Sequence, residues 1–238
     1  MGLAPNTFWN DKSIFSLYLT SKLYYTGMYT YGYYDVEKYS YSGLESEVMW
    51  MDLNDNNGKR TIYNYWAVDM SYTREIGLPD RQRTLIIDSG FDKIIVPNSD
   101  LAALWLWYDK KYKDDKKFDE VVFRHNDGNI TMECPPKYYD KELIAGMNVN
   151  VKAYSGEDRL GGDKSKAKWH KINVPLKAVF SPTTEVASGN TNRRIYVSNV
   201  IHDKKFKPPG GQSENRSYWV MGTPFLVNFY SIYDPQNK

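Results

Sequence analysis

The apolar segment Leu-Ile-Ile at residues 85–87 runs directly into Asp88-Ser89-Gly90, and this junction constrains the fold more than any other part of the chain. Consecutive bulky apolar residues are typical of a strand that is buried on both faces. Gly90 lets the backbone fold back without a Cβ clash, so the carboxylate of Asp88 stays at the turn. The sequence therefore predicts a buried strand over residues 84–88 that presents an acidic side chain at its end.

Two segments near the end of the chain complement this first strand. Residues 219–226 read Trp-Val-Met-Gly-Thr-Pro-Phe-Leu, and residues 229–234 read Phe-Tyr-Ser-Ile-Tyr-Asp. Taken alone, Asp-Ser-Gly is ordinary turn chemistry. Together with these two segments, in this order, it resembles the C-terminal lobe of pepsin-like aspartic proteases. In that family an Asp-Thr/Ser-Gly turn, a hydrophobic-hydrophobic-Gly segment and a Phe-aromatic-Asp strand build half of the active site.

Other segments resemble the same family in the same order along the chain. They are Gly-Leu-Ala at residues 2–4, Ile-Phe-Ser-Leu-Tyr-Leu at 14–19, Gly-Tyr-Tyr-Asp at 32–35, Tyr-Ser-Gly at 41–43, Tyr-Trp-Ala-Val at 65–68 and Val-Pro-Leu at 174–176. The last of these stands where the family has a Tyr-Pro-Leu hairpin. The resemblance therefore covers nearly the whole chain.

The resemblance implies a mostly β fold, namely the C-terminal lobe of the bilobal pepsin-like acid protease fold with a few short helices. Residues 1–13 would be the interlobe segment left from a missing N-terminal lobe. Residues 14–238 would form the C-terminal catalytic lobe, lacking its last strand. The missing lobe, part of the same full-length chain, would carry the other catalytic aspartate and the flap hairpin. The resemblance also implies a secreted, vacuolar or lysosomal location.

The activity implied is that of an aspartic endopeptidase of peptidase family A1, acting on peptide or protein substrates, with Asp88 as a catalytic residue. The hydroxyl of Ser89 would bond across to the opposite lobe. Gly90 and Gly222 would let backbone segments cross closely, and both are also turn and packing glycines. Because this chain supplies a single aspartate of the pair, we expect it to be inactive alone. Two alternatives stay open: a degenerate lobe that binds peptides or proteins without catalysis, and a half-protease that homodimerises.

Composition argues against other classes of function. The chain has 31 basic and 29 acidic residues and a net charge of +2, which gives no support to a nucleic-acid partner. No apolar run approaches the about 20 residues that span a bilayer, so no membrane segment is expected. The histidines His125, His170 and His202 lack the spacing of metal ligands. We therefore expect no metal and no cofactor.

The 21 tyrosines, many of them at every second position, favour strands over helices. Beyond residues 84–88, we expect antiparallel strands with a Gly-Tyr-Tyr-Asp turn within residues 24–53, and further strands at 61–70, 91–97, 174–180 and 194–201. Asn-Ser-Asp at 98–100 predicts a helix N-cap, followed by a helix with large apolar residues from 101 to 108. Lysine-rich stretches at 110–117 and 163–171 predict surface insertions. Cys134, the single cysteine, is expected to be a buried thiol or to have a partner in the missing lobe.

The residue after the Asp-Ser-Gly turn departs from the family pattern. The family places Thr or Ser there, and its hydroxyl bonds the catalytic carboxylate, whereas this chain has Phe91. A benzyl group cannot donate that bond, and a hydrogen bond to a charged group contributes about 1.5–3 kcal/mol. Phe91 therefore predicts slower turnover, or it marks a lobe that no longer catalyses.

Restoring the hydroxyl tests this interpretation. In the full-length protein, Phe91→Thr should leave kcat/KM for peptide hydrolysis unchanged or raise it, by up to about one to two powers of ten. Steady-state peptide cleavage at acid pH measures the effect. A large loss of activity would show that the ring of Phe91 has a different role at the site.

Overall fold

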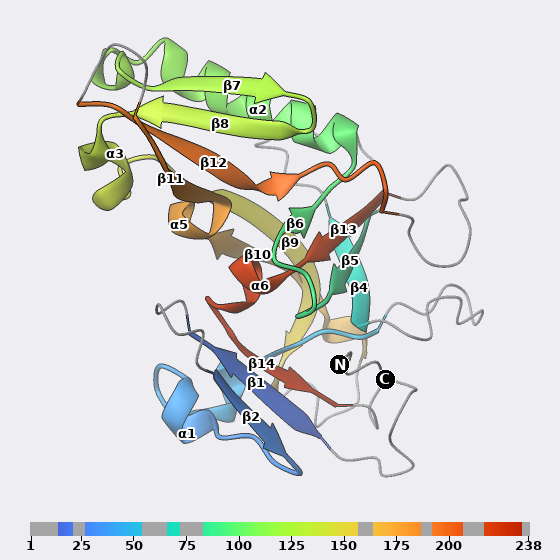
Figure 1. The fold of residues 1–238 in the computed structure, drawn as a ribbon. Helices are drawn as coiled ribbons and strands as arrows, with labels where there is room; N and C mark the ends of the chain where they lie inside the picture. Colours follow the sequence, from blue (N-terminus) through green and yellow to red (C-terminus); the bar gives the residue numbers. More distant parts are fainter. Residues whose placement is uncertain are drawn as a thin grey trace.

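The computed structural model describes residues 14–20, 27–53, 66–71, 83–156, 164–186, 192–206 and 217–234 (Figure 1). The chain is mostly β, as the sequence predicts. Its strands are β1 (Phe15–Leu19), β2 (Gly27–Tyr31), β3 (Met49–Trp50), β4 (Trp66–Ser71), β5 (Arg83–Ile87), β6 (Ile94–Ile95), β7 (Val122–Asn126), β8 (Asn129–Cys134), β9 (Met147–Ser155), β10 (Lys168–Val174), β11 (Phe180–Val186), β12 (Arg194–Ile201), β13 (Ser217–Met221) and β14 (Tyr230–Tyr233). Its helices are α1 (Val36–Tyr39), η1 (Glu45–Glu47), α2 (Asn98–Lys113), η3 (Lys116–Phe118), α3 (Pro136–Asp140), η4 (Lys164–Lys166), α5 (Leu176–Val179) and α6 (Thr223–Leu226). The expected interlobe segment, residues 1–13, lies outside the described residues.

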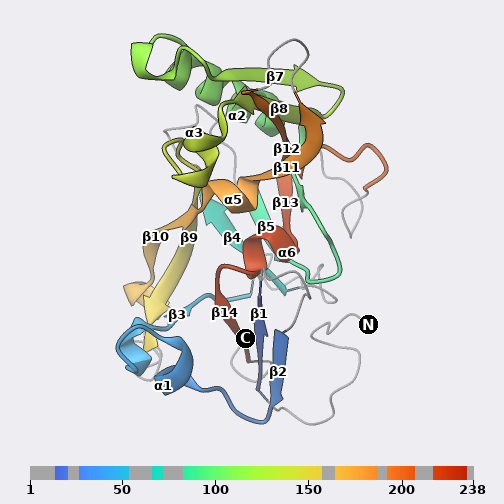
Figure 2. The same cartoon turned by 60° about the vertical axis from the view of Figure 1, so that its left-hand side comes forward.

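In the described part of the chain the strands form two sheets. The smaller has the order β14-β1-β2, and the larger has the order β10-β9-β4-β5-β13-β6-β12-β8-β7, with β11 paired to β12 and β3 paired to β9. Figure 2 shows the small sheet and α1 below the body of the large sheet. Most neighbouring strands are antiparallel, but β5 pairs with β13, and β6 with β12, in parallel. These two parallel pairings lie at the centre of the large sheet.

Aromatic rings join the small sheet to the large one. Phe15 of β1 lies opposite Tyr233 of β14, and their rings stack with 4.6 Å between centroids. Trp66 of β4 meets the Tyr233 ring edge to face at 4.9 Å. Such aromatic pairs contribute about 0.5–1.5 kcal/mol beyond the area they bury. The aromatic residues at alternating strand positions therefore fix how the two sheets pack.

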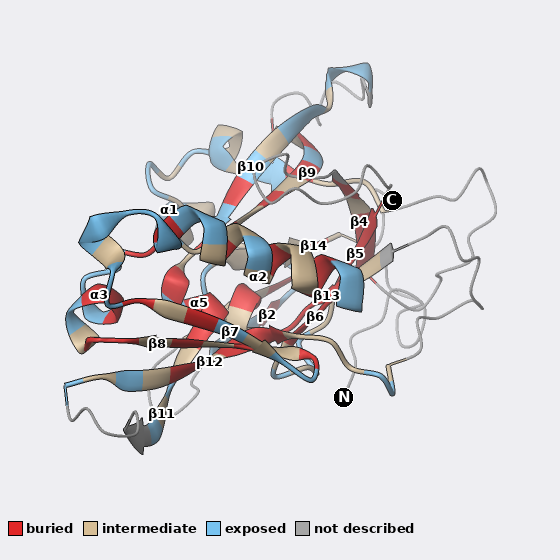
Figure 3. Cartoon of the chain, turned by 90° about the horizontal axis from the view of Figure 1, so that it is seen from above, coloured by how far each residue is buried: buried red, intermediate tan, exposed pale blue. Residues whose placement is uncertain are grey.

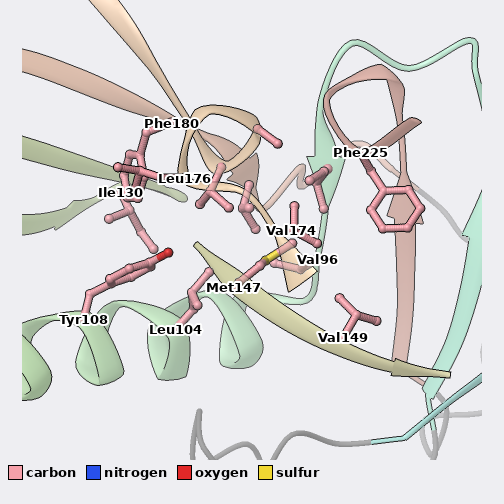
Figure 4. Close-up of a cluster of buried hydrophobic side chains, with 14 of the residues drawn as sticks. Val96, Leu104, Tyr108, Ile130, Met147, Val149, Val174, Leu176, Phe180 and Phe225 are labelled. Carbon is pink, nitrogen blue, oxygen red and sulfur yellow. The ribbon is translucent and has the colours of Figure 1, made fainter. Parts of the chain in front are cut away.

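The main core lies between α2 and the large sheet. The buried apolar residues of α2 are Leu101, Leu104, Tyr108 and Tyr112, which recur at helical spacing. Figure 3 shows buried and exposed positions alternating along this helix. Its inner face packs with strand residues such as Ile130 in one large cluster (Figure 4). Burying one large apolar side chain contributes about 1.5–3 kcal/mol, so this cluster is the chief hydrophobic contribution to stability.

Strands 84–88 and 194–201 are confirmed, within one residue, as β5 and β12. Within residues 24–53 the strands β2 and β3 are separated, as expected, at the Gly-Tyr-Tyr-Asp turn, but the turn leads into the helix α1 rather than directly into the next strand. Gly32, with φ at +85°, ends β2, and the carboxylate of Asp35 accepts the Lys38 N–H at the start of α1. The expected strand over 91–97 is limited to β6 at its centre.

The predicted strand over 174–180 was wrong. Pro175 lacks the N–H that a strand ladder needs, so β10 ends at Val174 and Pro175 precedes the helix α5. Val-Pro-Leu therefore begins a short helix rather than a hairpin.

The lysine-rich stretches are exposed, but their described residues belong to regular elements. Lys110, Lys111 and Lys113 lie in the last turn of α2, where positive charges stabilise the helix terminus. Lys168 and Lys171 belong to β10, an edge strand of the large sheet, where lysines discourage pairing with other chains. The buried thiol predicted at Cys134 is confirmed as a free cysteine, and burial raises the pKa of Cys134 to about 12.

The N-cap predicted at residues 98–100 was wrong, because Asp100 lies in the core. The helix α2 begins after Pro97 without a side-chain cap hydrogen bond. The Asp100 carboxylate accepts hydrogen bonds from Arg83 Nε at 2.7 Å and Nη2 at 3.0 Å, and from Trp219 Nε1 at 2.7 Å. Arg83 is 0% and Asp100 1% exposed. This buried network joins β5, α2 and β13. It lies at the start of β5, whereas Asp88 follows the end of that strand.

Removing the negative charge of this network should destabilise the fold strongly. Asp100→Asn removes the carboxylate charge that pairs with the buried Arg83 guanidinium, and breaking a buried ion pair costs about 3–5 kcal/mol of unfolding free energy. The matched control is Asp127→Asn, which removes the partner of Lys204 in a pair where both side chains are well exposed. That change should have little effect on stability, because solvent screens an exposed ion pair. Urea unfolding measures both, and equal effects would contradict the role of the Arg83–Asp100 pair.

Candidate active site

Asp88 follows immediately after β5, and β5 lies between two strands. It pairs antiparallel with β4 and parallel with β13, where Ile87 lies opposite Met221. The Asp88 N–H continues this ladder by donating to the Met221 carbonyl at 3.1 Å. The backbone of Asp88 is therefore held by the sheet, while its side chain stands at the end of the strand.

Residues 88–91 form a tight turn around the carboxylate. The Phe91 N–H donates to the Asp88 carbonyl at 3.3 Å, and the Gly90 N–H donates to Asp88 Oδ1 at 2.9 Å. Asp88 is partly buried, whereas Ser89 and Gly90 are exposed. The turn thus orients one carboxylate oxygen and leaves the group open to other molecules.

Gly222 lies where the chain crosses from one side of β13 to the other. After the turn, β6 pairs with the opposite edge of β13 from β5, so the connecting segment passes Gly222. A Cβ at Gly222 would lie 2.3 Å from the Lys93 carbonyl oxygen and 2.4 Å from that of Phe91. The Thr223 N–H donates to the same Phe91 carbonyl at 2.7 Å. The absence of a side chain at Gly222 permits this close crossing.

Two aromatic side chains flank the turn. The ring of Phe91 packs edge to face against Phe206 at 5.9 Å, beside a small apolar cluster that includes Ile86 and Val220. Burial raises the pKa of the Tyr233 hydroxyl to about 12; a hydrogen bond with Ser231 opposes this rise, and the nearby negative charge of Asp88 adds to it. Tyr233 therefore stays neutral beside the Asp88 carboxylate at physiological pH.

The structure brings Asp88, Ser89, Gly90, Phe91 and Gly222 together at one crossing of the backbone, although they come from two distant segments. Tyr233 lies in the aromatic segment at 229–234, but nothing in the sequence indicates that it is near Asp88. The Arg83–Asp100–Trp219 network was also missed, because an arginine at the start of an apolar strand does not by itself reveal a buried partner.

A family model for eukaryotic aspartyl proteases matches residues 9–238 of the sequence. The chain belongs to this family. The match includes both segments of the crossing at Gly222, so the geometry around Asp88 lies inside the region that defines the family. A search of curated proteins found no significant match.

A solved structure of an aspartic proteinase supports the fold of this aspartyl protease family member. An aspartic proteinase from Irpex lacteus is 16% identical with a TM-score of 0.54, and the match covers 94% of this chain and 54% of that one. Basic 7S globulin from soybean is 8% identical with a TM-score of 0.43, covering 93% and 47%. The chain thus spans about half the length of these structures. Among its described helices, none is long and apolar enough to cross a membrane.

Substitution of Gly222 by alanine should lower the stability of the fold more than the same substitution at Gly90. Gly222→Ala forces two backbone carbonyls to move, and overpacking of this kind costs up to about 3 kcal/mol. The control is Gly90→Ala, where the nearest atom to an added Cβ is Asp88 Oδ1 at 3.1 Å and the site is exposed. Thermal and urea unfolding compare the two variants. A cost at Gly90 as large as that at Gly222 would refute the close-crossing argument.

Proposed function

We propose that this chain supplies Asp88 as one of the two catalytic carboxylates of an aspartic endopeptidase, which hydrolyses peptide bonds by activating water. The observation that supports this most directly is the partly exposed side chain of Asp88 at the end of β5. Its backbone N–H donates to the Met221 carbonyl, and its carboxylate accepts the Gly90 N–H within the turn at residues 88–91. Membership of the eukaryotic aspartyl protease family indicates the class of reaction, which is peptide hydrolysis. The second carboxylate comes from an N-terminal lobe of the same full-length protein.

The chemistry follows from the repulsion between two acids. Two carboxylates a few ångströms apart cannot both ionise without a large cost, so they share one proton and titrate as a pair. The ionised member removes a proton from a water molecule held between them. The protonated member donates a hydrogen bond to the scissile carbonyl and so makes it a better electrophile.

The other residues of the turn have supporting roles. Ser89 is exposed, so its hydroxyl is placed to bond with the facing lobe and hold the two turns in register. The Gly90 N–H restrains Asp88 Oδ1 at 2.9 Å. Gly222 keeps the connecting segment close to β13. A secreted or vacuolar/lysosomal location accords with this function.

A non-catalytic role in binding peptides or proteins is the second candidate, and Phe91 favours it. The ring of Phe91 packs against Phe206, and this position has no hydroxyl to bond the Asp88 carboxylate. The turn would then keep its fold while its acidic group no longer takes part in hydrolysis.

Asp88→Asn tests the catalytic proposal in the full-length protein. The amide cannot act as a base, so kcat/KM for a peptide substrate at acid pH should fall about 10²–10⁴-fold. The matched control is Asp92→Asn, because Asp92 is exposed and lies outside the turn hydrogen bonds. It should keep nearly full activity. Hydrolysis that survives in Asp88→Asn would remove Asp88 from the catalytic pair.

The quaternary state separates the three alternatives. Size exclusion combined with a pepstatin-sensitive peptide assay should find this chain inactive alone and active when joined to the other lobe. An active homodimer of this chain would support the half-protease. Inactivity of the joined lobes, with peptide binding retained, would support the non-catalytic module.

A further inference from the structure

A cavity of about 640 Å³ lies between the two sheets, in the described part of the chain. It is bounded by α1 and β14 on the side of the small sheet, by β3 and β4 on the side of the large sheet, and by α6. Figures 1 and 2 show α1 and the small sheet below the body of the large one. The aromatic walls of the cavity include Tyr39, Trp50, Trp66, Phe229, Tyr230 and Tyr233. We call it the inter-sheet pocket. Its volume lies within the about 300–1,000 Å³ of sites that take small organic ligands.

The aromatic walls are fixed by contacts with one another and with the backbone. Tyr39 of α1 stacks on Tyr230 of β14 at 4.4 Å between centroids. The Tyr230 hydroxyl accepts the Asp35 N–H at 2.9 Å and donates to Ser16 Oγ at 2.7 Å. Trp66 and Tyr233 meet edge to face. Because these contacts join the walls to one another and to the backbone, a ligand would find its binding surface largely preformed.

The charge of the lining selects the kind of ligand. The charged residues among those that line the pocket are Glu47 and Asp234, both acidic. The Glu47 carboxylate accepts the Ser42 N–H at 2.9 Å, and this hydrogen bond lowers the pKa of Glu47, so it is ionised at neutral pH. Glu47 is exposed and therefore stands at the opening of the pocket. An anion would be repelled there, whereas a cation would be attracted.

One wall already contacts a positive charge. Lys38 Nζ lies 5.1 Å from the centre of the Tyr39 ring, although Lys38 does not line the pocket. The negative face of a tyrosine ring attracts ammonium groups in this way. Because the Tyr39 ring already contacts Lys38 and Tyr230, an ammonium group that enters the pocket depends on Glu47 and on the other aromatic walls.

We propose that the inter-sheet pocket binds a small apolar or aromatic molecule with a cationic amine head, its apolar part among the aromatic walls and its ammonium group at the acidic opening. The site is separate from the turn of Asp88. It includes Ile87, the residue before Asp88, but not Asp88 itself. The proposal does not depend on peptide hydrolysis, so it can fail or succeed independently of the catalytic one.

A matched pair of fluorescent probes tests the proposal on the intact chain. Dansylcadaverine carries a naphthalene ring and an ammonium group, and dansylsarcosine carries the same ring and a carboxylate. Energy transfer from tryptophans to the dansyl ring reports binding in the pocket, because Trp50 and Trp66 line it. We expect saturable binding of dansylcadaverine and binding of dansylsarcosine that is at least about tenfold weaker. Equal binding of the two probes, or no saturable binding, would overturn the proposal.

Variants locate the probe. Glu47→Gln should weaken dansylcadaverine binding about two- to fivefold, the range expected for an exposed ion pair. The control Glu37→Gln removes an equal charge from α1 at a residue outside the lining and should leave the dissociation constant unchanged. Val36→Trp should block the pocket, whereas Leu44→Trp adds an indole outside the lining, at an exposed site, and should not. Near-UV circular dichroism checks that each variant is folded.

Two other occupants give different results, and either one would overturn the proposal. If residues 1–13 or 235–238 fill the pocket, the probe should bind only after their removal. If a second copy of the chain fills it, the probe should dissociate a dimer seen by size exclusion, and Val36→Trp should abolish that dimer.

Discussion

The backbone crossing at Gly222 holds together the part of the molecule on which any function of Asp88 depends. The strand β13 lies between β5 and β6, so the chain that leaves β5 must pass the end of β13 to reach the far side. It does so within van der Waals reach of Gly222, and the Phe91 carbonyl accepts the Thr223 N–H. Asp88 is thus placed by backbone hydrogen bonds and by one missing side chain. Because this placement depends mainly on backbone groups, it can persist while most side chains change. This fits the fold that the chain shares with the Irpex lacteus proteinase at 16% identity.

Much of this arrangement could be predicted from the sequence, because its determinants are local. The apolar run that ends in Asp-Ser-Gly marks β5 and its turn, and the structure places this strand as expected. The apolar run that ends in Met-Gly forms β13 beside it. The network of Arg83 and Asp100 could not be predicted in the same way. An aspartate near the start of a helix has the pattern of a cap, and only the packing of β5 against α2 shows that its partner is a buried arginine. The extent of α2 was missed because lysines interrupt its apolar pattern beyond Tyr108, although Tyr112, one turn later, is buried.

The strand β5 links the two sites discussed above. Successive side chains of a strand point to opposite faces, so Ile87 lines the inter-sheet pocket while Asp88, one position later, belongs to the turn. Tyr233 connects them from the other side. Its ring lines the pocket and packs on Trp66, and its hydroxyl lies close enough to Asp88 for the charges to interact. The small sheet therefore contributes to the surroundings of Asp88 as well as to the pocket.

Phe91 shows why family membership and activity are separate questions for this chain. Its ring gains an edge-to-face contact with Phe206, and such a contact contributes about 0.5–1.5 kcal/mol. The hydroxyl found in the family would give a hydrogen bond to Asp88, but a partly exposed carboxylate obtains similar bonds from water, so folding loses little without it. The exchange of a hydroxyl for a ring is therefore close to neutral for stability. The missing hydroxyl matters for catalysis only when water is excluded and the carboxylate must hold one orientation. A catalytic cleft closed by two lobes creates these conditions.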